Sequence, residues 1–241
     1  MKTAQILIVG DEILSGRTTD SNSNYLARAL FVRGVRVQRI EVIPDNLILI
    51  GQWIQNCHGL TDFTFVAGGI GGTPDDMTRE GVARGLGVEL KRHKEAAAIL
   101  LKYYGEKINS DRLGMADLPM GCQLIENNVT HAPGFKIKNI YVFAGIPKIL
   151  HAMFEKIQNE ITGDPLFEEE LKLKVGEGDI AQFMRIINME FPLLELGSYP
   201  TLDPDKGYKT QLVFRATSQK VVRDALARFK ELQAGPTLKK V

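Results

Sequence analysis

The chain has 241 residues, of which 44% are hydrophobic and 24% are charged. These proportions are typical of a soluble globular protein, and a chain of this length can bury a core without disulfides or metal ions. Its 30 Lys and Arg residues balance 29 Asp and Glu residues, which excludes a globally basic, polyphosphate-coating protein. The two cysteines, Cys57 and Cys122, form no CxxC motif, so we expect two buried thiols in a reducing compartment.

No segment has the features of an export signal or a membrane span. The apolar run near the N-terminus, Ile6–Val9, is shorter than the apolar region of a signal peptide. No run approaches the ~18 apolar residues that cross a membrane. We therefore expect a cytoplasmic protein without a membrane partner.

Strand and helix patterns alternate in the first part of the chain. Buried strands are predicted over 4–9, 35–43 and 62–67. Helices are predicted from Asp20 or Ser21 to Arg33, over 46–57, and from the end of a glycine-rich loop to Leu86. Residues 11–20 form a polar loop between the first strand and the first helix. This alternation implies parallel βαβ units in a sheet covered by helices.

The second part of the chain divides at Gly163-Asp164-Pro165, which is the best candidate linker. Before it we predict a helix over 93–107, an irregular stretch over 109–134, one strand over 135–143 and an amphipathic helix over 147–161. After it we predict a strand over 168–175, a helix over 178–190, strands over 194–199 and 209–216, and a helix over 218–232. We therefore expect two domains, 1–163 and 166–235, the second a small two-layer α/β domain.

The segment Gly68–Thr78, GGIGGTPDDMT, carries the strongest functional signal. Its four glycines follow a buried strand and precede a helix, so backbone N–H groups and a positive helix end favour a phosphate or pyrophosphate there. The segment does not match the dinucleotide fingerprint, because Pro74 stands where the last glycine would be. The absence of a GK[ST] motif excludes an ATPase P-loop.

Two adjacent carboxylates, Asp75 and Asp76, follow the glycines. They would repel a bound phosphate unless a cation lay between them, and Mg²⁺-type cations take one or two carboxylates together with phosphate oxygens. The alternative is that one of the two caps the helix while the other is solvated.

Further acidic residues follow the first two strands. Asp11 and Glu12 come after the first strand, and Asp45 comes after the second. Because ligands of open α/β sheets bind outside the carboxyl ends of the strands, these loops and the Asp75-Asp76 loop could converge on one crevice. Asp45 could equally be a plain helix cap.

The order of these motifs resembles the molybdopterin-binding (MoaB/Mog-like) domain family. Within it, the chain is most similar to the N-terminal region of competence/damage-inducible protein A (CinA) and to the molybdopterin-binding-like region of eukaryotic FAD synthase. The matching segments are GDEILSG at 10–16, DSN at 20–22, VIPD at 42–45, AGGIGGTPDDMT at 67–78, APGF at 132–135, FAGIP at 143–147 and LGSYP at 196–200.

This resemblance implies a three-layer α/β/α domain with a mostly parallel sheet, followed by a small KH-like α/β domain. It also implies binding of a small-molecule nucleotide or pterin phosphate, and a homo-oligomer. CinA-like members are associated with divalent-metal-dependent hydrolysis of ADP-ribose assisted by K⁺, the FAD synthase region with FAD hydrolysis, and MoaB/Mog proteins with molybdopterin binding and adenylylation. The expected cation is Mg²⁺, Mn²⁺, Co²⁺ or Ni²⁺.

The resemblance also assigns roles to residues of this chain. The phosphate-binding residues would be Gly68, Gly69, Gly71, Thr73 and Thr78. Asp45 and Asp76 would be catalytic, and Asp75, Asp76 and Glu12 would hold the metal.

Three segments depart from the family pattern. Gly72 stands where a proline is usual, Asn128–His131 replaces NPxGT, and Ala144 replaces the proline of LPGxP. All three border the predicted crevice, so they bear on the choice of substrate and on activity.

Three functions are therefore considered. The first is a metal-dependent pyrophosphatase acting on an adenine-containing diphosphate, ADP-ribose before FAD. The second is a molybdopterin-binding module with transferase activity or no catalysis. The third, nucleic-acid binding by the KH-like part, is not expected, because Gly176–Asp179, GEGD, lacks the GxxG spacing and is acidic.

Overall fold

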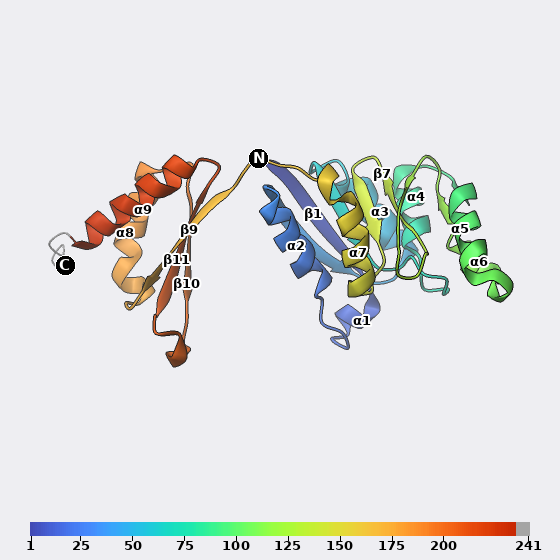
Figure 1. Ribbon diagram of the computed structural model, residues 1–241, viewed down its shortest axis with the longest axis horizontal. Coiled ribbons are helices and arrows are strands. Elements are labelled where there is room, and N and C mark those ends of the chain that lie inside the picture. The colour runs from blue at the N-terminus through green and yellow to red at the C-terminus, as the bar shows by residue number, and fades with distance from the viewer. Residues whose placement is uncertain (235–241) are drawn as a thin grey trace. The chain divides into compact units, whose positions relative to one another are not determined.

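The computed structural model describes residues 1–234, which divide into two compact units, one ending at Gly163 and the other beginning at Asp164 (Figure 1). Each unit has its own hydrophobic core, so the two are described separately. Residue 235, the predicted end of the second domain, lies outside the described residues. Over residues 1–234, none of the helices has the length and apolar content needed to cross a membrane.

The first unit is built on a six-stranded sheet with the order β2-β1-β3-β8-β7-β6. The first four strands in this order are parallel, and β7 runs antiparallel to both of its neighbours, β8 and β6. The strands are β1 (Lys2–Val9), β2 (Val35–Ile43), β3 (Phe63–Ala67), β6 (Gln123–Ile125), β7 (Gly134–Ile137) and β8 (Ile140–Phe143). A separate two-stranded ribbon pairs β4 (Leu90–Arg92) with β5 (Asp117–Pro119). The mostly parallel sheet is as predicted.

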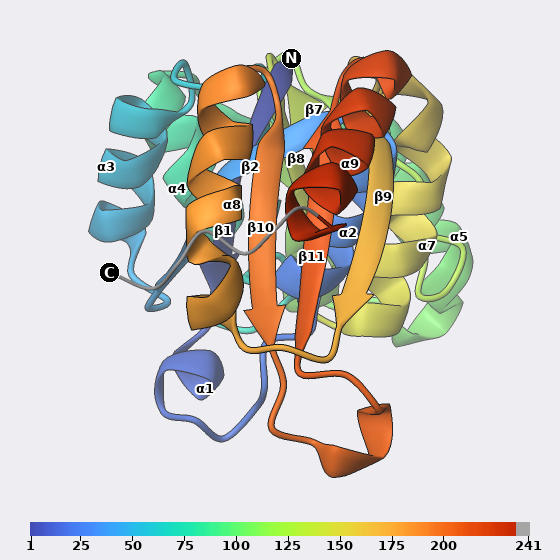
Figure 2. The same cartoon turned by 90° about the vertical axis from the view of Figure 1, so that its left-hand side faces the viewer.

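Helices cover both faces of this sheet, with α2 and α7 on one side and α3 and α4 on the other (Figures 1 and 2). The α-helices are α1 (Asp11–Leu14), α2 (Asn22–Val32), α3 (Leu47–Cys57), α4 (Thr78–Leu86), α5 (Lys94–Tyr104), α6 (Ser110–Gly114) and α7 (Pro147–Ile157). Two 3₁₀ turns, Gly105–Lys107 and Gln158–Glu160, follow α5 and α7. Because both sides of the sheet are covered, the last six residues of β1 are all buried. The predicted three-layer α/β/α arrangement is confirmed, and both cysteines are buried free thiols.

Three predictions about local structure are wrong. Residues 135–143 are not one strand but the hairpin β7–β8, whose turn places Lys138 at a φ of 53°. The alternation of FKIKNIYVF continues through this turn, so the sequence conceals it. The polar loop 11–20 begins with α1, and the irregular stretch 109–134 contains α6, β5 and β6.

The second unit has the predicted β-α-β-β-α order. Its antiparallel sheet has the order β10-β11-β9, and both helices lie on one face of it (Figure 2). The elements are β9 (Phe167–Leu173), α8 (Glu177–Glu190), β10 (Glu195–Pro200), the 3₁₀ turn Pro204–Lys206, β11 (Thr210–Ala216) and α9 (Gln219–Ala234).

Helices α3 and α4 pack side by side through glycines. A Cβ atom added to Gly85 would lie 2.6 Å from the carbonyl oxygen of Gly51, and one added to Gly81 would lie 2.4 Å from the side chain of Ile50. From Gly81 to Gly85 along α4, the contacted residue on α3 changes from Ile50 to Gly51. The two helices therefore run in the same direction, and their N-termini are neighbours. This packing brings the residues before α3 and before α4 to the same edge of the sheet.

We expect Gly85→Ala to lower the free energy of unfolding by about 1–3 kcal/mol, because the added methyl group meets backbone that cannot move freely. Urea unfolding measures this change. The matched control is Gly114→Ala in α6, where an added Cβ meets nothing within 4 Å. That helical substitution is expected to be neutral or stabilising by up to ~1 kcal/mol. Equal stability of the two variants would contradict the close approach of α3 and α4.

Candidate functional site

A cavity of about 540 Å³ lies at the carboxyl ends of the parallel strands β1, β3 and β8. The glycine loop after β3 lines it, together with the loop before α3, the end of α5 and the loop 127–132. Seven predicted site residues line this cavity: Glu12, Asp45, Gly68, Gly69, Gly71, Asp75 and Asp76. The expected convergence of the strand-end loops is therefore present in the structure.

The glycine loop turns sharply at Gly68 and Gly69, whose φ angles of 106° and 66° are in the region that favours glycine. A Cβ on Gly68 would lie 2.1 Å from the carbonyl oxygen of Val9, so no larger residue fits. The N–H of Gly68 donates to the carbonyl of Phe143 and is not free for a ligand. Within residues 1–234, the N–H groups of Gly69, Ile70 and Gly71 donate to no protein acceptor. These three donors line the cavity and suit an anionic oxygen.

Thr73 and Thr78, both predicted to bind phosphate, do not line the cavity. The backbone N–H and the hydroxyl of Thr73 donate to Oδ2 of Asp76, at 2.9 and 2.6 Å. Thr78 is fully buried beneath Gly69, and its N–H donates to the Gly69 carbonyl. In this structure both threonines shape the loop that carries the donors.

Neither α3 nor α4 is capped by Asp45, Asp75 or Asp76. The side chain of Asn46 caps α3 by accepting the N–H groups of Ile48 and Leu49, so the alternative that Asp45 is a plain cap is wrong. The first turn of α4 has no side-chain cap. Asp75 is exposed, and Asp76 binds Thr73.

The surroundings of Asp45 shift the pKa of its carboxyl group upward. Burial raises its pKa, and the negative charges of Asp11, Glu12 and Asp75 raise it further. The N–H of Asp11 donates to Oδ2 of Asp45 at 3.0 Å, which partly offsets this shift and fixes the direction of the carboxylate. Crowding of like charge in one cavity is typical of sites that act on charged ligands.

The donors around the cavity are suited to a hard cation that is shared with a ligand. Over residues 1–234, no three His, Cys, Asp or Glu side chains form a group able to hold a metal ion, so Glu12, Asp75 and Asp76 do not form a complete metal site by themselves. The available carboxylates are oxygen donors, as Mg²⁺ and similar ions prefer, and such ions commonly complete their shell with substrate phosphates and water. The residues present therefore fit a cation held jointly by carboxylates and phosphate oxygens.

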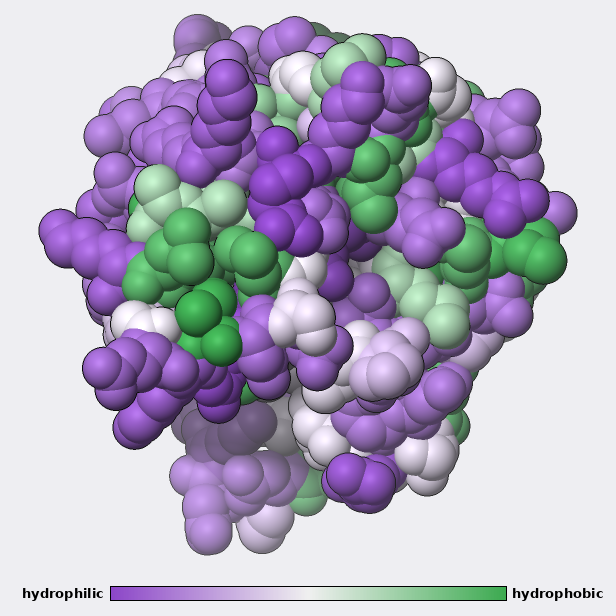
Figure 3. All heavy atoms as spheres, turned by 90° about the vertical axis from the view of Figure 1, so that its right-hand side faces the viewer, coloured by the Kyte–Doolittle hydropathy of each residue, from purple (hydrophilic) through white to green (hydrophobic). Residues whose placement is uncertain are grey.

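Four residues that line the cavity could not be predicted from the sequence motifs. Tyr104, Met115, Asn127 and Thr130 line it, and they come from α5, from the chain just after α6 and from the loop 127–132. The only signal was the altered segment at 128–131, which borders the crevice as expected. The side of the unit that carries α5 and α6 is largely hydrophilic, with separate apolar patches (Figure 3).

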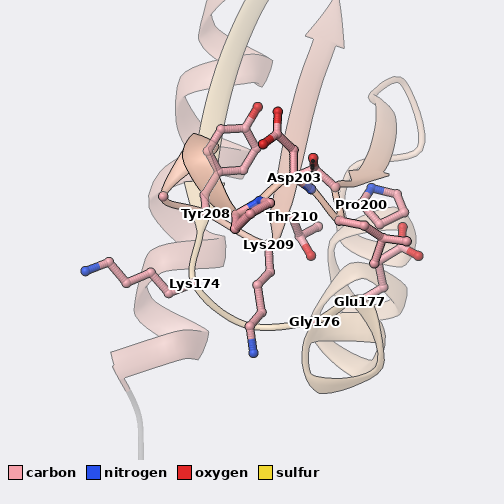
Figure 4. Close-up of a pocket in the computed structure, with 12 residues that line it drawn as sticks. Lys174, Gly176, Glu177, Pro200, Asp203, Tyr208, Lys209 and Thr210 are labelled. Atoms are coloured by element: carbon pink, nitrogen blue, oxygen red, sulfur yellow. Dashed lines mark hydrogen bonds between the residues drawn. The ribbon is translucent and has the colours of Figure 1, made fainter.

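A second cavity, of about 780 Å³, lies in the second unit beside the N-terminus of α8 (Figure 4). Its charged residues are balanced, with Lys174 and Lys209 opposed by Glu177 and Asp203. The side chain of Lys174 points away from the other labelled residues (Figure 4). This cavity therefore presents no clear charge preference for a ligand.

The fold and the first cavity together define an α/β domain that presents a glycine loop with free backbone N–H groups at the carboxyl ends of its parallel strands. Residues 5–163 match the family described as probable molybdopterin binding domain, and this chain belongs to that family. Residues 165–238 match the family described as FAD synthase, middle domain. The resemblance inferred from the motifs is thereby confirmed.

Individual relatives support this assignment. A protein of Archaeoglobus fulgidus is 33% identical over 227 residues, covering 94% of this chain and 96% of that protein. A probable FAD synthase of Caenorhabditis elegans is 28% identical over 262 residues, covering 97% of this chain but 50% of the relative. This chain thus spans about half the length of that synthase. The crystal structure of CinA from Thermoplasma acidophilum is 35% identical with a TM-score of 0.63, covering 67% of this chain and 99% of that one.

We expect Asp45→Asn to stabilise the protein at neutral pH and not under acid conditions. Because its pKa is raised above 3.8, the folded state binds the Asp45 proton more tightly than the unfolded chain does. Below pH 3.8 the carboxyl group is mostly protonated in both states, so its charge does not destabilise the folded protein. The destabilisation develops as the pH rises from there through the higher pKa of the folded state. Since the carboxylate is partly exposed, the gain should stay below about 1 kcal/mol.

Urea unfolding of both proteins at pH 3 and at pH 7 measures this difference. The asparagine oxygen can still accept the Asp11 N–H, so the substitution removes the charge and keeps the hydrogen bond. If the stability difference between Asp45→Asn and the wild type were the same at the two pH values, the surroundings of Asp45 would not disfavour its charged form.

Proposed function

We propose that this chain is a divalent-metal-dependent pyrophosphatase that hydrolyses an adenine-containing diphosphate, with ADP-ribose preferred over FAD. One observation carries the proposal: free backbone donors and four carboxylates line the same cavity. No Lys or Arg is among the lining residues that the structure describes in residues 1–234. A diphosphate held by these donors would be repelled by the carboxylates unless a cation accompanied it.

In this proposal the N–H groups of Gly69, Ile70 and Gly71 bind phosphate oxygens and stabilise the charge that develops on them. Arg79 supports the loop from behind, since its guanidinium donates to the carbonyl of Ile70. Asp45, aligned by the N–H of Asp11, orients the attacking water and accepts its proton. A bound divalent cation would neutralise phosphate charge and acidify that water.

A second candidate is a molybdopterin-binding module with transferase activity or none. The family match over residues 5–163 favours it, and so do the departures from the family pattern. Thr130 and Ala144, within two of the altered segments, line the cavity. The third, Gly72, lies against α6, where an added Cβ would be 2.9 Å from the carbonyl oxygen of Asp111. A pterin that bound at micromolar concentration without any turnover of ADP-ribose or FAD would support this candidate.

We expect Asp76→Asn to reduce kcat for AMP release from ADP-ribose by about 10²-fold or more, because it removes a charged group at the reacting phosphate. The asparagine oxygen can still accept from Thr73, so the loop should keep its shape. The assay follows AMP release from ADP-ribose and from FAD with Mg²⁺, Mn²⁺, Co²⁺ or Ni²⁺, with and without K⁺.

The matched control is Glu80→Gln, an exposed carboxylate on α4 that does not line the cavity. It should leave turnover unchanged. Metal-dependent turnover that survives in Asp76→Asn would refute the assignment of Asp76. An absence of turnover by the wild-type protein with every metal would refute the proposed pyrophosphatase.

A further inference from the structure

Part of the cavity lining has no role in the proposed phosphate chemistry. This part includes Tyr104, Met115 and Thr130. The cavity volume of about 540 Å³ is in the range of pockets that enclose whole small molecules, which exceeds what a phosphate group alone requires. The cavity therefore has room for the part of a substrate that does not react.

The ring of Tyr104 is held in place by its neighbours. The guanidinium carbon of Arg112 lies 4.8 Å from the ring centroid, and the ring of Tyr103 meets it edge-on at 4.9 Å. A cation over an aromatic face stabilises the ring position. Met115 is 7% exposed and offers a polarisable thioether, which packs well against aromatic rings. Together they present an ordered apolar surface to the cavity.

The loop 127–132 is equally well fixed. The buried Asn127 side chain accepts from the N–H groups of Val129 and Thr130 and donates to Thr130 Oγ1 and to the Ala132 carbonyl. His131 has a φ of 60°, an unusual value for a residue other than glycine, and its N–H donates to the Asn127 carbonyl. Since Thr130 Oγ1 accepts from Asn127, its hydroxyl proton remains available to an acceptor in the cavity.

We infer that a planar nitrogen heterocycle of the substrate stacks on Tyr104 beside Met115, with the Thr130 hydroxyl donating to an acceptor on the ring edge. Tyr104 is then a specificity-determining residue. The site selects diphosphates that carry such a ring and discriminates against inorganic pyrophosphate. The inference rests on the proposed function for the position of the phosphates, which the glycine loop would hold.

Isothermal titration calorimetry of the full chain with Mg²⁺ tests this inference with three probes. These are α,β-methylene-ADP, methylenebisphosphonate, which has the same uncleavable bridge but no ring, and neopterin phosphate. Base–aromatic stacking is strong enough that Tyr104→Leu should weaken binding of the ring-bearing probes by about tenfold. Binding of methylenebisphosphonate should not change. Tyr104→Phe keeps the aromatic face and should bind as the wild type does. Unchanged binding of methylenebisphosphonate by Tyr104→Leu excludes loss of folding as the cause.

Unchanged binding of the ring-bearing probes by Tyr104→Leu, or an equal loss for methylenebisphosphonate, would overturn the inference. So would a wild-type protein that binds none of the three probes. The turnover assay reports separately on the proposed function: a Tyr104-dependent loss of probe binding in a protein that hydrolyses nothing supports the ring site and refutes the pyrophosphatase. A loss confined to α,β-methylene-ADP supports a nucleotide ring, and one confined to neopterin phosphate supports a pterin.

Discussion

The cavity depends on the close approach of three strand ends at Gly68. The carbonyl oxygen of Val9, at the end of β1, lies where a side chain at position 68 would begin. The N–H of Gly68 bonds to Phe143 at the end of β8, and Gly145 packs against the Gly68 backbone. Because no side chain can stand at this point, the chain after β3 turns into the cavity and presents its following N–H groups to a ligand.

The negative charge around these donors lowers the stability of the folded protein. Asp45 holds its proton more tightly in the folded protein than in the unfolded chain, since burial and its acidic neighbours disfavour the carboxylate. Asn46, and not Asp45, caps α3, so the charge of Asp45 is not needed to begin that helix. Residues whose charge costs stability are typical of functional sites, where activity and stability trade against each other.

The cavity lining is built by two different means. The glycine loop contributes backbone N–H groups, and parallel packing of α3 and α4 through Gly81 and Gly85 sets the positions of the acidic loops beside it. Other parts of the lining are side chains from α5 and from the loop 127–132, which Arg112 and Asn127 hold in place. Two of the segments that depart from the family pattern, at Thr130 and Ala144, also line the cavity.

The order of the elements, the glycine loop and its acidic neighbours could be predicted from the sequence, because hydrophobic periodicity and glycine placement are local properties. Asp20 illustrates this, since its carboxylate accepts from the Ser23 N–H at the start of α2, as its position suggested. Only the tertiary structure could decide the β7–β8 hairpin, because alternation continues through its turn and the pairing that defines it lies across the sheet. The same holds for Thr73 and Thr78, which bind within the loop, and for Tyr104 and Asn127, which reach the cavity from distant segments. Contacts between segments far apart in the chain leave no periodic signal in the sequence, so this part of the cavity lining was determined by the tertiary structure alone.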